Sequence, residues 1–156
     1  MRWARELLIA ALVIAFVWTA LFLRTLPNLA RDILFFAVLL LALGMTVACW
    51  WAWARSRKTP SVPVWRVFAG LAGAVANTVA FVLPHGTVLY NMAFLSARVA
   101  LPFPMVDWLA ILPICLICSI TGIVAGLLAP RASRLVISLT GVIVGTFAMA
   151  IPIGVL

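Results

Sequence analysis

The chain has 156 residues, of which 67% are hydrophobic and 9% charged, and its formal net charge is +8. Ordinary soluble domains are about 45–50% apolar and about 25% charged, so this composition excludes a water-soluble globular protein. A bilayer core about 30 Å thick is crossed by roughly 20 apolar residues in a helix. The sequence contains five uncharged runs of at least 17 residues and therefore predicts an integral membrane protein.

The predicted fold is all-α, a multi-pass transmembrane helical bundle in which residues 1–156 form one domain. The five spans are expected at residues 7–23, 33–54, 67–83, 108–129 and 135–156. The first span follows two arginines, as the apolar core of a signal peptide would. Its run exceeds the usual length of about 7–15 residues, however, and no A-x-A cleavage site follows it. We therefore expect a retained span.

The uncharged run 67–97 is too long for one simple span. As a straight helix it would measure about 46 Å, and Pro84 is the expected break. Beyond this break, polar residues with helical spacing share one side, and they are Thr87, Asn91 and Arg98. The pattern predicts a short outer amphipathic helix between the third and fourth spans.

Lysine and arginine concentrate in alternate gaps between the spans. Eight of the eleven stand at the N-terminus and in the gaps 55–66 and 131–134. The positive-inside rule therefore predicts a cytoplasmic N-terminus and an external C-terminus. This placement argues against nucleic acid as a partner. The loop 55–66 can also attract anionic lipid headgroups, although a topology signal alone accounts for its charge.

Most of the seven tryptophans are expected to anchor the spans at the membrane interfaces. Five stand at predicted span ends, and they are Trp50, Trp51, Trp53, Trp65 and Trp108. Arginine outnumbers lysine ten to one, which is typical of GC-rich bacterial genomes. We therefore expect a bacterial protein of the cytoplasmic (inner) membrane.

Small residues share one helical face on each of three spans. The GxxxG pattern, which lets membrane helices approach closely, occurs at Gly122–Gly126 and again at Gly141–Gly145. The other members of these faces are Gly70, Gly73, Asn77 and Ser119. We expect a tight three-helix core in which Asn77 turns inward and bonds to Ser119 or its neighbouring backbone. Alternatively, these faces meet a partner subunit.

Few residues inside the spans can carry chemistry. No Asp or Glu lies in a predicted span, which disfavours a self-sufficient ion-coupled transporter. Cys115 and Cys118 form a C-x-x-C pair that resembles membrane thiol oxidoreductases of the vitamin K epoxide reductase type. The resemblance implies a redox pair, yet those enzymes use a second cysteine pair in an outer loop, and the outer loops here contain none. The alternative is that these cysteines are small apolar packing residues.

His85 is the only histidine. It could ligate a haem iron or a chlorin magnesium, or accept a proton near neutral pH. Haem in a bundle usually takes a second axial ligand, and the chain has no second histidine. The position after Pro84 is instead typical of a solvated loop residue.

The sequence is best interpreted as a non-enzymatic integral membrane subunit without a cofactor. It would act as a scaffold, assembly or accessory component, in contact with the lipid bilayer and with other integral membrane subunits or itself. The tail 151–156 resembles the Pro-x-Gly-x-Leu ending of the small subunits of tripartite tricarboxylate transporters. That resemblance covers six residues of a family with four spans, and it implies the small subunit of a transporter. The alternatives are a thiol oxidoreductase using Cys115 and Cys118 and a pigment- or haem-binding subunit using His85.

The charge pattern gives a testable orientation. In a background without other cysteines, we expect Lys58→Cys to react with an impermeant maleimide only from the cytoplasmic side, and Arg98→Cys only from outside. The measurement is labelling of intact cells against labelling of inverted vesicles. Reaction of position 58 on intact cells would contradict the orientation.

Overall fold

A computed structural model describes residues 14, 28–59, 61–96 and 107–150. The regular elements in these ranges are four helices, in the order α2 (Asn28–Ser56), α3 (Val64–Ser96), α4 (Trp108–Leu128) and α5 (Arg131–Ala150). Each is long and apolar enough to cross a membrane. The expected all-helical, multi-span class is confirmed. The first predicted span, apart from Ile14, and the tail 151–156 lie outside the described residues.

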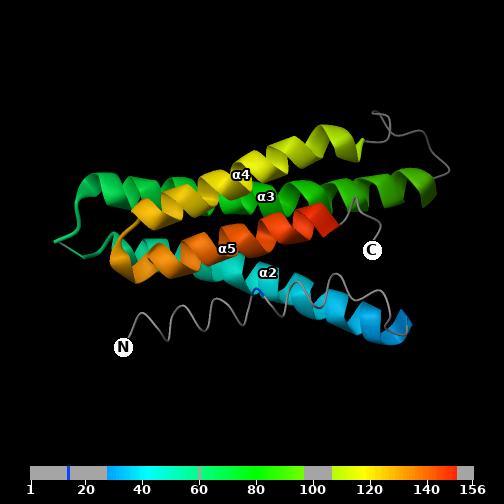
Figure 1. Ribbon diagram of the computed structural model, residues 1–156, viewed down its shortest axis with the longest axis horizontal. Coiled ribbons are helices and arrows are strands. Elements are labelled where there is room, and N and C mark those ends of the chain that lie inside the picture. The colour runs from blue at the N-terminus through cyan, green and yellow to red at the C-terminus, as the bar shows by residue number, and fades with distance from the viewer. Residues whose placement is uncertain (1–13, 15–27, 60, 97–106, 151–156) are drawn as a thin grey trace.

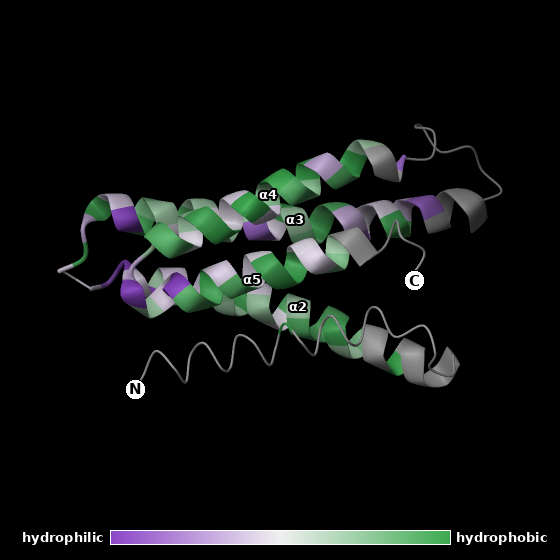
Figure 2. Ribbon diagram, in the orientation of Figure 1, coloured by the Kyte–Doolittle hydropathy of each residue, from purple (hydrophilic) through white to green (hydrophobic). Residues whose placement is uncertain are grey.

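The four helices form an elongated bundle (Figure 1). α3 and α5 run parallel, and α4 lies antiparallel against both of them. α2 packs on the opposite side, where it contacts α3 and α5 but, within the described ranges, not α4. α5 is the most enclosed helix, and its fully buried side chains include Ile137, Ile143 and Phe147. Hydrophilic residues gather at the end of the bundle where α2 turns into α3 and α4 turns into α5 (Figure 2).

Most predicted spans lie close to the observed helices. The span expected at 33–54 falls inside α2, and the span expected at 108–129 matches α4 to one residue. α5 begins at Arg131, four residues before the predicted boundary, because the Pro130 carbonyl accepts hydrogen bonds from the backbone N–H groups of Ser133 and Arg134. These bonds start the helix directly after Pro130.

The predicted break at Pro84 is wrong, because α3 continues through it as one helix of 33 residues. Proline removes one backbone hydrogen bond, whereas ending a helix inside lipid would leave several backbone groups unpaired. Pro84 is buried against its neighbours. Thr87, one turn further on, donates a hydrogen bond to the Leu83 carbonyl at 2.9 Å.

The separate amphipathic surface helix is therefore also wrong. Its expected polar face belongs to the last turns of α3, and this face points into the bundle. Thr87 and Asn91 are buried, while Leu89 is 69% exposed. Arg98 lies outside the described residues. A polar face in a membrane helix turns toward other helices, whereas on a surface helix it would turn toward water.

α2 is attached to its neighbours by polar bonds from two of the expected anchor residues. The Trp50 indole N–H donates to the Thr78 hydroxyl at 2.8 Å, and the Trp53 indole N–H donates to the Val67 carbonyl at 3.1 Å. These two tryptophans thus bond to α3, and their expected position at the membrane interface stays a prediction. Trp51 and Trp65 are 63% and 55% exposed, as residues of an aromatic belt would be.

The contact between α4 and α5 gives a stability prediction. A Cβ atom on Gly126 would lie 2.6 Å from the backbone nitrogen of Ser138, whereas a Cβ on Gly44 would meet no atom within 4 Å. We expect Gly126→Ala to lower the free energy of unfolding by about 1–3 kcal/mol, and the matched control Gly44→Ala to leave it unchanged. Reversible unfolding in mixed detergent micelles measures both. Equal effects of the two substitutions would contradict the close helix contact.

Candidate functional site

Asn77 lies in the middle of α3 and is completely buried. Its side-chain nitrogen Nδ2 donates a hydrogen bond to the Ile137 carbonyl oxygen on α5 at 2.8 Å. The same nitrogen lies 3.9 Å from the Cys49 sulfur on α2. One amide group therefore contacts two other helices at the centre of the bundle.

The carbonyl end of the Asn77 side chain fits against two glycines. A Cβ atom on Gly122 of α4 would lie 1.8 Å from Asn77 Oδ1, and a Cβ on Gly141 of α5 would lie 3.1 Å from it. Any larger residue at position 122 would overlap the amide. Oδ1 has no conventional hydrogen-bond partner among the described residues. It lies against the Gly122 main chain, whose Cα–H groups can serve as weak donors.

Ser119 is not the hydrogen-bond partner of Asn77, so the predicted pairing is wrong in this detail. The serine is buried on α4, and its hydroxyl packs against Gly145, where a Cβ would lie 3.0 Å from Oγ. The amide bonds to Ile137 because the glycine contacts bring the α5 backbone within reach. A carbonyl oxygen that already accepts its helical bond keeps a second lone pair for this purpose.

The remaining small residues that the sequence singled out lie in the same contact region. A Cβ on Gly73 would lie 2.6 Å from Ile137 Cγ2, and one on Gly126 would lie 2.5 Å from the Ser138 hydroxyl. Gly70 is less crowded, since its nearest neighbour is the Trp53 ring at 3.4 Å from the Cβ position. The small-residue faces of α3, α4 and α5 thus meet one another within a single chain.

Sequence reasoning missed several polar contacts of this core. The Thr140 hydroxyl lies 3.2 Å from the Met45 carbonyl of α2 and 2.6 Å from the Val136 carbonyl of its own helix. The Ser138 hydroxyl donates to the Ile123 carbonyl of α4 at 3.3 Å. Serine and threonine next to small residues on one helical face could have predicted these contacts. Membrane helices use such hydroxyl groups to form hydrogen bonds to neighbouring helices.

The three cysteines are free thiols inside the bundle. Cys115 is 1% exposed and packs with Ile111 and Ala148, while Cys118 is only partly buried. Cys49 lies beside the Asn77 amide. Cys115 of the C-x-x-C pair thus forms part of the contact between α4 and α5.

His85 lies within α3, which contradicts the solvated loop position expected for it. Its Nδ1 atom hydrogen-bonds to the Phe81 carbonyl and therefore carries the proton, because a carbonyl oxygen can only accept. The ring stacks on Phe147 of α5 with the centroids 4.9 Å apart, and the Phe81 ring is 4.3 Å away. Nε2 is buried and has no hydrogen-bond partner in the described part of the chain.

No group of three or more His, Cys, Asp or Glu side chains is arranged to hold a metal ion within residues 28–59, 61–96 and 107–150. Asn77, Ser138 and Thr140 instead lie within hydrogen-bonding distance of main-chain carbonyls on neighbouring helices. Comparison with protein families, with curated proteins and with solved structures found no match to this chain.

The Asn77 contacts give a direct stability prediction. We expect Asn77→Ala to lower the free energy of unfolding by about 0.6–2 kcal/mol, the range for one polar contact between membrane helices. Val79→Ala, which changes an outward-facing residue 40% exposed on the same helix, is the matched control and should change it by less. Equilibrium unfolding in micelles provides the comparison. An Asn77→Ala variant as stable as the control would show that the amide contributes nothing.

The burial of Cys115 gives a prediction about thiol chemistry. We expect simultaneous replacement of Cys115 and Cys118 by alanine to leave assembly and thermal stability close to those of the unchanged protein, because small apolar cysteines in a helix contact are expected to act as packing side chains. The measurement is gel filtration with a melting curve, under oxidising and under reducing conditions. A redox-dependent difference that disappears in the double variant would identify the pair as chemically active.

Proposed function

We propose that this protein is a non-enzymatic integral membrane subunit that acts as a scaffold, assembly or accessory component of a larger membrane complex. The observation that carries the proposal is the use of the interior polar groups. Asn77, Ser138 and Thr140 all bond to main-chain carbonyl groups of neighbouring helices. These three bonds each join two helices of the bundle.

The glycine contacts support a static core. Transport by alternating access needs helices that move between two arrangements. Here a Cβ on Gly126 would come within 2.6 Å of a backbone atom of α5, and one on Gly141 would lie 3.0 Å from the Ser119 carbonyl of α4. Such close contacts leave little room for these helices to slide past one another. The working surface is therefore the outside of the bundle.

The outward face of α2 is suited to a partner helix. Its large apolar residues recur with alternating spacings of three and four, expose between 46% and 66% of their surface, and are Ile33, Phe36, Leu40, Leu43 and Val47. This is the spacing of the contact line between two helices in a left-handed pair. Gly44 lies beside the line with open space around it, which permits close approach of a second helix.

The basic segments also suggest where the protein resides and how it is oriented in the membrane. The chain resides in the cytoplasmic membrane of a bacterium, with the basic segments 55–66 and 131–134 on the cytoplasmic side. The partner is another integral membrane subunit, and a transporter is the complex that the tail sequence favours. The outward face of α2 then meets that subunit inside the bilayer.

A photo-crosslinking residue placed at Leu40 tests this function. We expect a protein adduct from position 40, and none from the matched control position Ile120 on α4, which is 60% exposed against 66% for Leu40. The same partner should remain bound to the unmodified protein during purification in mild detergent. Absence of a protein adduct at position 40, together with absence of a co-purifying subunit, would overturn the proposal.

A pigment- or haem-binding subunit is the second candidate, favoured by His85. Its Nδ1–H group is held by a backbone carbonyl, the arrangement that leaves Nε2 as a ligand in metal-binding histidines. Nε2 is buried in the bundle, so α3 and α5 would have to part at this end to admit a tetrapyrrole. An absorption band in the purified protein that is lost in His85→Ala would establish this function.

A further inference from the structure

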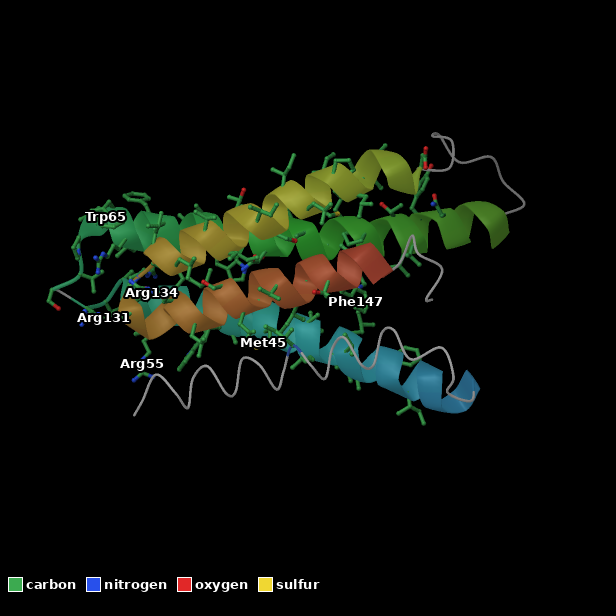
Figure 3. The ribbon with its side chains drawn as sticks, in the orientation of Figure 1. Met45, Arg55, Trp65, Arg131, Arg134 and Phe147 are labelled. Carbon is green, nitrogen blue, oxygen red and sulfur yellow. The ribbon has the colours of Figure 1, made fainter. Side chains whose placement is uncertain are left out.

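Six cations lie at the end of the bundle where α2 turns into α3 and α4 turns into α5. This basic end consists of Arg55, Arg57, Lys58, Arg66, Arg131 and Arg134. Figure 3 shows Arg55, Arg131 and Arg134 together at this end, with Trp65 beside them. A charge signal for membrane topology requires only that these residues stand in the right loops of the sequence. It does not require the particular arrangement of Arg66 and Arg134 in space.

Arg66 and Arg134 lie on helix faces that meet. Gly70 of α3 contacts Ile137 of α5, with 3.6 Å between the Gly70 Cβ position and the Ile137 side chain. Arg66 precedes Gly70 by four residues and Arg134 precedes Ile137 by three, so each arginine lies one turn outward on the contacting face of its helix. Because α3 and α5 run parallel, both arginines lie at the same end of this contact.

These two arginines carry buried donor atoms that remain unpaired. The Nε atoms of Arg66 and Arg134 are both buried, and neither has a hydrogen-bond partner among the described residues. Guanidinium N–H groups are costly to bury without an acceptor. Two like charges on facing helix surfaces also repel one another.

The local backbone adds to the positive potential. Arg66 stands in the first turn of α3, and Arg131 and Arg134 stand in the first turn of α5, where neither helix has an acidic residue. A helix N-terminus carries a partial positive charge and favours anions. Asp32 and Asp107 belong to the starts of α2 and α4, at the opposite end of the bundle. Among the described residues, no acidic side chain belongs to this end, so an anion from outside the described chain would complete the arrangement.

The position of the basic end relative to the bilayer indicates which anion could bind there. All four apolar spans begin or end here, and the exposed Trp51 and Trp65 mark the level of the headgroups. Their rings also stack under cations, with the Arg55 guanidinium 5.3 Å and the Arg66 guanidinium 5.1 Å from the respective ring centroids. At this level the abundant anion is the phosphate of a membrane lipid.

We propose that Arg66 and Arg134, between the N-termini of α3 and α5, form a binding site for the phosphate group of an anionic phospholipid. The planar guanidinium group matches phosphate with two parallel hydrogen bonds. The other four cations attract anionic lipid in general, whereas these two hold one headgroup in place. The bound lipid neutralises the charge between α3 and α5 and so stabilises their contact.

The test uses the full chain in nanodiscs of phosphatidylcholine that contain a minor fraction of phosphatidylglycerol or cardiolipin. Spin-labelled anionic lipid reports occupancy through quenching of tryptophan fluorescence. We expect Arg66→Gln with Arg134→Gln to weaken retention of anionic lipid about tenfold. The matched control, Arg55→Gln with Lys58→Gln, removes the same charge from exposed positions and should weaken it less than twofold.

Each other outcome overturns the proposal. Equal losses in the two double variants would indicate diffuse attraction of lipid to the whole basic end. Equal retention of phosphatidylcholine and phosphatidylglycerol by the unchanged protein would show no anion site, and displacement of the lipid by millimolar inorganic phosphate would assign the site to free phosphate. Should the double variant fail to fold, the single variants are measured, and each is expected to lose about threefold.

Discussion

The amide of Asn77 reaches the Ile137 carbonyl because Gly122 and Gly141 present no side chain where α3, α4 and α5 meet. In lipid, a polar group without a partner is costly, so the amide must find an acceptor on another helix. Glycine allows the close approach that brings the acceptor within range. The Asn77 hydrogen bond and the two glycines therefore act together. Their combined geometry fixes the register of α3, α4 and α5 relative to one another.

The rest of the bundle is built outward from this contact. Once α3 and α5 are aligned in parallel, Gly73 receives Ile137 on one side of the amide, and Phe147 stacks on His85 farther along. α2 then adds to the groove between α3 and α5 through Trp50 and through the contact of Thr140 with a carbonyl of α2. The same parallel alignment places Arg66 and Arg134 at the same end of the bundle. The fold and the proposed lipid site therefore depend on the same helix alignment.

The sequence predicted the features that depend on length and periodicity. Spans follow from apolar runs, and the small-residue faces follow from the 3.6-residue period, so the glycines and Asn77 could be grouped correctly. The acceptor of the Asn77 amide could not be predicted, because every residue carries a backbone carbonyl. Nor could the sequence separate Trp50, which faces α3, from Trp51, which faces outward, since that difference is set by the rotation of α2 against its neighbours.

Pro84 and His85 show where a rule from soluble helices fails. In water, the carbonyl that proline leaves unpaired is readily solvated, and a helix can end nearby at little cost. Inside a bundle in lipid, continuation through proline leaves fewer groups unpaired than a break does. The consequence is that Thr87, Asn91 and His85 belong to a long α3 and contribute to its interior face. Whether these three residues face the interior depends on how the helices are arranged, which the sequence pattern alone does not specify.

A double-mutant cycle between Asn77 and Gly122 tests the central claim most directly. All three atoms nearest to a Cβ on Gly122 belong to the Asn77 side chain. Gly122→Ala should therefore cost about 1–3 kcal/mol in the unchanged protein and almost nothing when Asn77 is already alanine. The free energies of unfolding of the four proteins in micelles give the coupling. A coupling above about 1 kcal/mol is predicted, and additivity within about 0.5 kcal/mol would contradict the contact on which the bundle depends.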